Sequence, residues 1–413
     1  MITRHRPIRL TVVQTHPVQY YAPWFRHIAA RCPELDLTVL YATAPTAAQQ
    51  GVGFGVSFQW DTPLVEGYRC RILRAARPRE SVHSERFWGL DVPEIGAALG
   101  ESRPDVALIP GWHSVTLARA LWACRRARIP TLYRGDTHLG LRPTGWRGAV
   151  WGARTRRLVH LFDGHLSVGT RAREYLTHFG VDPCEVFDAP HAVDNEFFAR
   201  TSSLHRTPDA RMAARVSWGL EPQAFVVLFV GKLEPKKRPL DLIRAMGGLG
   251  SRASVLVVGT GELMTACRVE ADRLGLRAAW AGFLNQSELG RAYAVADCLV
   301  LPSDWAETWG VVVNEALATG LPCVVADRVG CAPDLVTRGK TGEVFPTGNL
   351  AELTAALGRI RAGVESGRDY AHACRERAAS HSFDRTTAGL LAACRATAGS
   401  RASVRSNRPA GDG

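Results

Sequence analysis

Residues 297–327 read DCLVLPSDWAETWGVVVNEALATGLPCVVAD. Two short apolar runs, 298–301 and 322–326, lie on either side of a segment of helical character, 308–320. Continuous apolar runs of this length are typical of strands that are buried on both faces of a sheet. A strand, a helix and a second strand in this order predict two parallel strands joined by a crossover helix.

The same alternation extends through the second half of the chain. Further strands are predicted at 224–231, 254–259, 278–282 and 341–346, with helical segments between them. Alternating strands and helices predict a doubly wound parallel sheet, an α/β fold. The first half has the same pattern, except that residues 45–90 are rich in Gly, Pro and Arg and give no clear assignment.

Two such sheets predict two Rossmann-like domains that face each other across a cleft. The 413 residues suit two domains of ordinary size. We expect an N-terminal domain over 1–198, a linker over 199–217 and a C-terminal domain over 218–395, whose last helix crosses back to the first domain. The polar stretch 396–413 is expected to be disordered.

Composition indicates a globular protein, with 46% hydrophobic and 22% charged residues. The ten cysteines form no C-x-x-C pair, which favours reduced thiols in the cytoplasm over a disulfide framework or a zinc site. The N-terminal apolar run is too short for the core of a signal peptide, and no window approaches the ~18 apolar residues of a membrane span. We expect a cytoplasmic protein that is at most peripheral on the inner face of the cytoplasmic membrane.

The net charge of +12 is concentrated in residues 119–173, which hold twelve arginines and only two acidic residues. Within them, 142–157 interleaves arginines with Trp146 and Trp151. One interpretation is a solvated basic face, and another is a site for anionic lipid headgroups or a lipid diphosphate. Binding of nucleic acid is disfavoured, because no nucleic-acid motif accompanies the charge.

Charged and glycine residues gather where the predicted strands of the second half end. Lys232 and Lys237 follow one strand, Gly259 and Gly261 follow the next, and the segment 303–311 opens a helix. A helix N-terminus attracts anions, and glycines allow a ligand to approach the backbone. Two lysines beside a helix start indicate a pyrophosphate site.

Glu307 and Glu315 are separated by seven residues, within a pattern P-S-x-x-x-E-x-x-G-x-x-x-x-E-A-x-A-x-G-x-P. Together with GKLEPKKRP at 231–239, this pattern resembles the retaining glycosyltransferases of family 4, which have the GT-B fold. The resemblance is strong over 225–350 and weaker over 8–198. Within these two segments the chain departs from the family pattern at two positions: Lys232 stands where Arg is usual, and Cys323 precedes Val324.

The resemblance implies roles for these residues. Glu307 would bind hydroxyls of a donor sugar, Glu315 would accept from ribose hydroxyls, and Lys232 and Lys237 would neutralise the leaving diphosphate. The remaining expected donor-binding residues are Gly231, Gly259, Gly261, Phe283 and Leu284 (at the base), Thr308, Trp309, Gly310 and Val311. Fixed cations at a leaving diphosphate stabilise the charge that develops as the bond breaks.

Histidines and charged residues follow the strands of the first half. The resemblance places His113 beside the reacting centre and implies an acceptor site near His16, Arg134 and Asp136. The family's glycine-rich loop after the first strand is missing, which leaves the mode of acceptor binding open. His191 stands where the family often has Asn, and a structural role is favoured for it.

We therefore expect a retaining hexosyltransferase that uses a UDP- or GDP-linked sugar and needs no cofactor. A metal-free reaction is expected because the chain has no Asp-x-Asp pair. The acceptor would be a glycan or lipid-linked sugar of the cell surface, or alternatively a soluble small molecule. A non-catalytic sugar-nucleotide-binding protein and a sugar-nucleotide epimerase are the other hypotheses.

Overall fold

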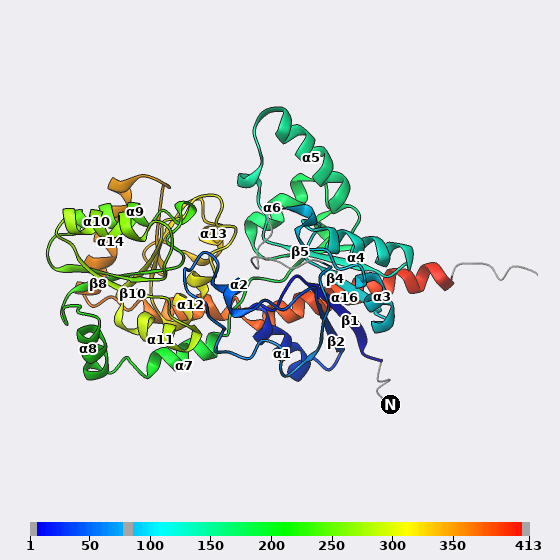
Figure 1. Cartoon of the computed structure of the whole chain (residues 1–413), viewed down its shortest axis with the longest axis horizontal. Helices are drawn as coiled ribbons and strands as arrows, with labels where there is room; N and C mark the ends of the chain where they lie inside the picture. The colour runs from blue at the N-terminus through cyan, green and yellow to red at the C-terminus, as the bar shows by residue number, and fades with distance from the viewer. Residues whose placement is uncertain (1–5, 77–85, 407–413) are drawn as a thin grey trace, which may run out of the picture. The chain divides into compact units, whose positions relative to one another are not determined.

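The computed structural model describes residues 6–76 and 86–406. The chain forms two compact units. Unit 1 contains the residues up to Gln49, then Pro63–Pro190 and the chain from Phe383 onward, and unit 2 contains Gln50–Thr62 and His191–Ser382. Each unit is an α/β structure around its own sheet, as the sequence predicted (Figure 1).

Unit 1 is built on a parallel sheet with strand order β3-β2-β1-β4-β5-β6-β7 in its described residues. The strands are β1 (Ile8–Gln14), β2 (Leu35–Tyr41), β3 (Arg69–Ile72), β4 (Val106–Ile109), β5 (Thr131–Gly135), β6 (Gly164–Ser167) and β7 (Val186–Asp188). The strand order reverses between β1 and β4, so the loops after these two strands are neighbours.

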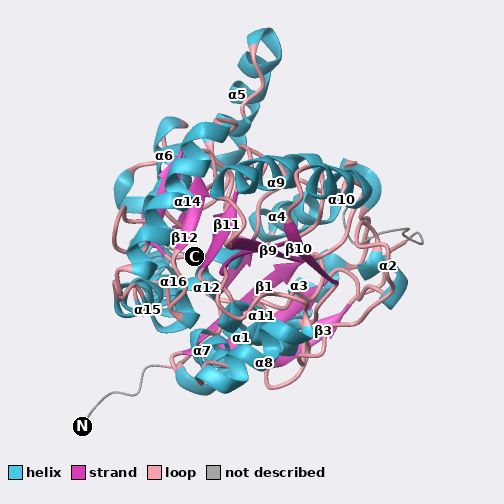
Figure 2. Cartoon of the chain, turned by 90° about the vertical axis from the view of Figure 1, so that its left-hand side faces the viewer, coloured by secondary structure: helices cyan, strands magenta, loops and turns pink. Residues whose placement is uncertain are grey.

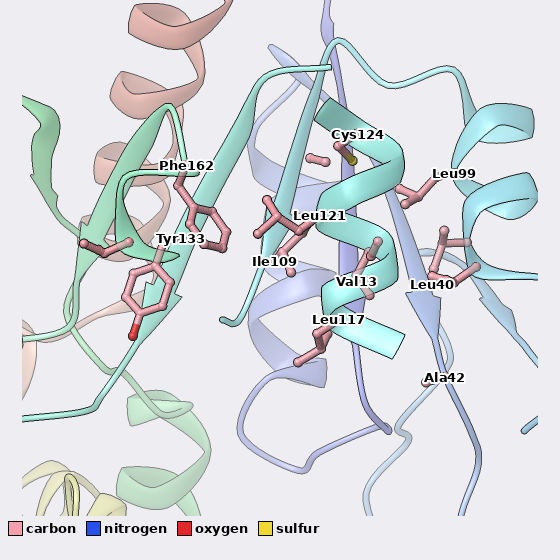
Figure 3. Close-up of a cluster of buried hydrophobic side chains, with 14 of the residues drawn as sticks. Val13, Leu40, Ala42, Leu99, Ile109, Leu117, Leu121, Cys124, Tyr133 and Phe162 are labelled. Atoms are coloured by element: carbon pink, nitrogen blue, oxygen red, sulfur yellow. The ribbon is translucent and has the colours of Figure 1, made fainter. Parts of the chain in front are cut away.

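Helices cover both faces of this sheet. The helices are α1 (Ala22–Arg31), α2 (Ala47–Gly51), α3 (Ile95–Ser102), α4 (Val115–Arg126), α5 (Gly145–Val159), α6 (Thr170–His178) and α16 (Phe383–Ser406), of which α2 spans the first boundary between the units. On one face, Leu117, Leu121 and Cys124 of α4 pack beside Val13 and Ile109 of the sheet (Figure 3). On the other face, α1 and α16 pack together over the strands.

Unit 2 is built on a second parallel sheet, with strand order β10-β9-β8-β11-β12-β13 in its described residues. The strands are β8 (Phe225–Val230), β9 (Ala253–Val258), β10 (Arg277–Gly282), β11 (Cys298–Leu301), β12 (Cys323–Ala326) and β13 (Gly342–Phe345). Every residue of β8, β9, β11 and β12 is buried, which explains their continuous apolar sequences.

The helices of unit 2 lie on both faces of its sheet, with α9, α10 and α14 on one side and α7, α8 and α11 on the other (Figures 1 and 2). They are α7 (Asn195–Ser203), α8 (Pro208–Ser217), α9 (Pro239–Met246), α10 (Met264–Arg273), α11 (Gln286–Val295), α12 (Val311–Thr319), α13 (Ala332–Leu335), α14 (Leu350–Glu365) and α15 (Ala371–Ala379). Helix α12 is buried from Val313 to Thr319, since it packs between α7 and α15.

The segment 199–217 was predicted to be a linker, but in the structure it is largely helical and packs on α11. Asp194 caps α7 and Thr207 caps α8, and both helices pack on α11. Arg215 of α8 is buried and bonds Asp297 at 2.9 Å. The polar side chains of these helices serve as caps and ion-pair partners.

The ends of the predicted domains also differ. The chain passes from unit 1 to unit 2 after Pro190, eight residues before the expected boundary at 198. Helix α16 continues to Ser406, through the first part of the stretch expected to be disordered from 396. The sequence has no proline before Pro409 to end that helix, and 407–413 lie outside the described residues.

Candidate functional site

The strand order of unit 2 reverses between β8 and β11, which lie side by side. In open parallel sheets, ligands bind beyond the carboxyl ends of the strands at such a reversal. Gly231 and Lys232 follow β8 directly, and the loop 302–310 follows β11. The fold therefore brings the lysine segment and the Glu307 segment to the same place.

Lys237 and Glu307 form an ion pair at this reversal, and each side chain is only 14% exposed. Lys237 ends a short 3-10 turn, η4 (Pro235–Lys237), and Ser303 donates to the Glu307 carboxylate at 3.4 Å. The backbone also joins the two segments, because Asp304 N donates to Lys236 O at 2.9 Å. An ion pair so poorly exposed is screened by salt much less than a surface pair.

Backbone contacts hold the loop that carries Glu307. Gly330 N donates to Glu307 O, and Cys331 N donates to Trp309 O, both at 3.0 Å. A Cβ at Gly330 would lie 1.7 Å from Thr308 O, so only glycine allows this approach. Thr308 also has interactions of its own. These contacts fix Glu307 at the start of α12.

Helix α12 begins at Val311, after Gly310 in the left-handed region with φ of 98°. A Cβ at Gly310 would lie 2.6 Å from Leu301 Cδ2, so a larger residue would be strained and crowded. The free N–H groups of the first turn of a helix attract an anion. The first turn of α12 thus starts where the Glu307 loop ends.

Glu315 lies one turn further along α12 and is 5% exposed. Its Oε2 accepts a hydrogen bond of 2.5 Å from the Tyr293 hydroxyl. Burial raises the pKa of Glu315 to about 7, while the bond from Tyr293 and the charge of Lys237 oppose this rise. Lys237 therefore acts electrostatically on both glutamates. Contact between Glu315 and a ribose stays a prediction.

Trp309 points into unit 2, where it is 4% exposed. Its indole N–H donates to Asn314 at 2.8 Å, and its ring centroid lies 5.4 Å from that of His191. Asn314 in turn donates to His191 O at 3.1 Å. These contacts give His191 the structural role that was favoured for it. The buried Trp309 side chain anchors the loop that carries Glu307.

The glycines after β8 and β9 allow the backbone of one loop to approach the other. A Cβ at Gly259 would lie 2.0 Å from Gly231 O, and one at Gly261 would lie 2.6 Å from Leu233 O. The nearest atoms to a Cβ at Gly231 belong to the Lys237 side chain. The space these glycines leave is filled by the protein itself, and their contact with a ligand stays a prediction.

Lys232 and Phe283, expected at the diphosphate and at the base, both contact a segment that sequence reasoning did not include. This segment is Gln50–Thr62, and it packs with unit 2 although the residues on both sides of it belong to unit 1. Leu284 is half-buried beside Phe283. The contacts of this segment with Lys232 and Phe283 were not predicted, because contacts between distant parts of the chain leave no local periodicity in the sequence.

In unit 1, the expected acceptor residues follow neighbouring strands. His16 follows β1, and its Nδ1 lies 3.0 Å from the Thr15 hydroxyl. His113 follows β4 at the surface of the unit. Partial desolvation of its imidazole lowers its pKa, and the charge of Asp136 opposes that shift. The loops of β1 and β4 meet at the strand reversal, so His16 and His113 share one end of this sheet.

Arg134 is 4% exposed and is directed into unit 1. It donates to the Tyr21 hydroxyl at 2.9 Å and to Ala189 O at 3.3 Å, and its guanidinium lies 5.0 Å from the centroid of the Trp24 ring. This geometry gives Arg134 a structural role between β5 and α1. A contact with an acceptor stays a prediction.

Two further observations concern metals and membranes. In residues 6–76 and 86–406, no three His, Cys, Asp or Glu side chains gather as a metal site would require. Over the same residues, no helix has both the length and the apolar composition needed to span a bilayer.

Residues 211–380 match the family model described as Glycosyl transferases group 1. A D-inositol 3-phosphate glycosyltransferase of Mycobacteroides abscessus is 33% identical over 332 residues, which are 74% of this chain and 72% of that protein. A protein of the same name from Actinosynnema mirum is 36% identical over 230 residues, 52% of each chain. The chain thus spans about half the length of this second relative.

Solved structures of the same fold include Anabaena Alr3699/HepE in complex with UDP, with a TM-score of 0.68 and 16% identity over 94% of this chain and 98% of that one. A glycosyltransferase from Rickettsia africae has a TM-score of 0.70 and 12% identity over 95% and 99% of the two chains. At these identities the likeness concerns the fold, and it matches the two parallel sheets described above.

Proposed function

Because the chain belongs to the group 1 glycosyltransferases, we propose that it transfers a hexosyl unit from a nucleoside diphosphate sugar to an acceptor hydroxyl. The Lys237–Glu307 ion pair at the strand reversal of unit 2 is the observation that carries this proposal. It places a cation and a carboxylate together, in a protected position, where a parallel sheet binds its ligands.

In this reaction, the bond between the anomeric carbon and the diphosphate oxygen breaks, and the acceptor oxygen bonds to that carbon on the same face. The acceptor hydroxyl gives its proton to the departing diphosphate oxygen. We assign Glu307 to the sugar hydroxyls, and Lys237 and Lys232 to the diphosphate. The first turn of α12 supplies N–H donors to the same diphosphate. Fixed charges of this kind stabilise the negative charge of the leaving group without a metal ion.

UDP is the first nucleotide to try, since the Anabaena protein of the same fold was crystallised with it, and GDP is the second. We assign the acceptor to unit 1, to the loops that carry His113, His16 and Asp136. The acceptor is either a glycan or lipid-linked sugar of the cell surface, or a soluble polyol. The name of the relatives makes inositol 3-phosphate the first soluble acceptor to test.

Helix α5 supports the first kind of acceptor, because it is suited to a membrane surface. Its buried residues are only Gly148, Thr155 and Val159, whereas Trp146 is 73% exposed and Val150 is 60% exposed. The helix stands away from the sheet of its unit (Figures 1 and 2). An exposed apolar face bordered by arginines is characteristic of helices that lie at the bilayer interface.

The proposal is tested with a thermal-shift panel of nucleoside diphosphates and their sugars. Donors that stabilise the protein are then incubated with inositol 3-phosphate or with a lipid extract, and products are identified by mass spectrometry. A product heavier than its acceptor by one hexosyl residue is expected. Stabilisation without any product would instead favour a sugar-nucleotide-binding protein, and conversion of the donor without an acceptor would favour an epimerase.

A further inference from the structure

We call residues Gln50–Thr62 the strap. The chain passes from unit 1 into the strap within α2, and it returns to unit 1 at Pro63. The strap reads QGVGFGVSFQWDT, with three glycines and three aromatic residues. It contacts residues that follow β8, β9 and β10, which are three neighbouring strands of unit 2. The strap therefore covers the strand ends to which the donor is assigned.

One part of the strap lies on Lys232. The ammonium group of Lys232 donates to Val52 O at 3.2 Å and lies 4.6 Å from the centroid of the Phe54 ring. A Cβ at Gly53 would lie 2.9 Å from the same nitrogen, and the φ of 85° at this position favours glycine. Lys232 thus has a carbonyl oxygen in front of it, in the position expected for a phosphate oxygen.

A second part of the strap lies on Phe283. The ring centroids of Phe58 and Phe283 are 4.1 Å apart with an interplanar angle of 32°, and Phe58 is only 9% exposed. Phe54 and Trp60 complete an aromatic cluster around Phe283, at 5.3 and 6.3 Å. The face of Phe283 that could stack on a nucleobase is therefore in contact with a phenyl ring.

The far end of the strap is attached to the first turn of α11. Asn285 donates to Gln59 O at 2.7 Å and accepts from Asp61 N at 3.2 Å. The carboxylate of Asp61 accepts from Ser287 N at 3.1 Å and also from the Ser287 hydroxyl. Nearer the start of the strap, Phe54 O accepts a hydrogen bond from the Thr260 hydroxyl. These polar contacts hold the strap without involving Lys232 or Phe283.

We propose that the strap occupies the positions of the donor nucleotide, with Val52 O on Lys232 in place of a diphosphate oxygen and Phe58 on Phe283 in place of the base. The docked strap and a bound nucleotide then exclude each other at both positions. The inference rests on the assignment of Lys232 and Phe283 to the donor under the proposed function.

Physical chemistry favours an exchange over a permanent cover. A diphosphate oxygen carries charge and is a stronger partner for a lysine than a neutral carbonyl. Gly53 and Gly55 lie in the left-handed region with φ of 85° and 68°, where glycine changes conformation at little cost. A docked strap reduces the apparent affinity for nucleotide to the intrinsic affinity multiplied by the fraction of molecules in which the strap is displaced.

The test compares nucleotide affinity in variants that weaken the strap at its two ends. Dissociation constants for UDP and GDP are measured by calorimetry for the wild type, Phe58→Ala and Asp61→Ala. Phe87→Ala and Glu185→Ala are the matched controls, because both lie in unit 1 and outside the strap. We expect both strap variants to bind nucleotide several-fold more tightly and both controls to match the wild type. Asp61→Ala alone carries the test if Phe58→Ala does not fold.

Hydrogen exchange gives a second readout on the wild-type protein. Addition of the nucleotide should increase exchange within 50–62, because the strap leaves its hydrogen bonds. Weaker binding by both strap variants, or unchanged or reduced exchange over 50–62, would show that the strap is a fixed wall and would overturn the inference alone. Binding only by the strap variants supports it. If neither wild type nor variants bind UDP or GDP, the inference and the proposed function both fall.

Discussion

The Glu307 carboxylate pairs with the Lys237 ammonium at the reversal of strand order in unit 2. The charge of Lys237 is therefore offset by a carboxylate. Burial limits both partners to 14% exposure, which strengthens the interaction relative to a surface pair. Removing either partner changes the field at the proposed diphosphate site in a predictable direction.

Glu307→Gln should reduce transfer by roughly 100-fold or more, the scale found when one preorganised transition-state contact is lost. The same substitution should leave the affinity for nucleoside diphosphate unchanged or increased, since Lys237 then keeps its full charge for the phosphates. Steady-state rates and calorimetry with UDP or GDP measure the two effects separately.

Glu315→Gln is the matched comparison, because it removes a carboxylate from the same helix and loop region. It should weaken binding of the nucleoside diphosphate, given the assignment of Glu315 to the ribose. An equal loss of diphosphate affinity in the two variants would show that the two glutamates do not have separate roles.

Lys237→Ala should lower kcat more than it weakens donor binding, because its charge matters most as negative charge develops on the leaving group. Lys232→Ala should lower kcat similarly. A change in KM alone would assign both lysines to ground-state binding.

The proposed reaction uses no metal ion, so activity should persist in excess EDTA. A strict dependence on Mn²⁺ or Mg²⁺ would contradict the metal-free reaction.

Glu315 should also make the stability of the nucleotide-free protein depend on pH. Its pKa is about 7 in the folded protein against 4.5 for an unperturbed glutamate, so the folded state retains a proton that the unfolded state loses. Stability from this group is fully present below pH 4.5 and is lost as the pH rises to about 7, by roughly 3 kcal/mol at most.

Thermal unfolding of Glu315→Gln between pH 4.5 and 7.5 measures this contribution. The amide keeps an acceptor for the Tyr293 hydroxyl but cannot ionise, so the fall in Tm toward neutral pH should be smaller than in the wild type. Glu66→Gln, an exposed carboxyl in unit 1, is the control and should follow the wild-type curve. Parallel curves for wild type and Glu315→Gln would show that Glu315 ionises normally.

The two sheets could be predicted from the sequence, because central parallel strands are continuous apolar runs. The candidate site was assigned to the ligand end of the second sheet from its topology, and that assignment stays a prediction. The edge strands β3 and β7 were not predicted, since they are only four and three residues long and β3 is largely exposed. The contact of Phe58 with Phe283 could not be predicted, because residues 225 positions apart in the chain carry no shared local pattern. The inward direction of Arg134 and Trp309 depends in the same way on tertiary packing.

Helix α5 provides the last prediction, which concerns a membrane surface. Trp146 and Val150 are exposed, and Arg147, Arg154, Arg156 and Arg157 lie on the same helix. Anionic headgroups attract each basic residue by about 1 kcal/mol, and salt screens the attraction. The four arginines together would contribute several kcal/mol, enough for reversible recruitment without a membrane anchor.

Co-sedimentation with liposomes tests this prediction. The wild type should pellet with anionic vesicles at low salt, stay in the supernatant with zwitterionic vesicles, and be released at high salt. A variant with Arg154, Arg156 and Arg157 replaced by Glu should remain in the supernatant and still bind nucleotide, because the binding residues lie in unit 2. Replacing Trp146 by Ala should weaken pelleting without changing its salt dependence, since the tryptophan contributes apolar contact and no charge. If the wild type does not bind anionic vesicles, α5 is a solvated basic helix, and a soluble acceptor such as a polyol phosphate is favoured over a lipid-linked one.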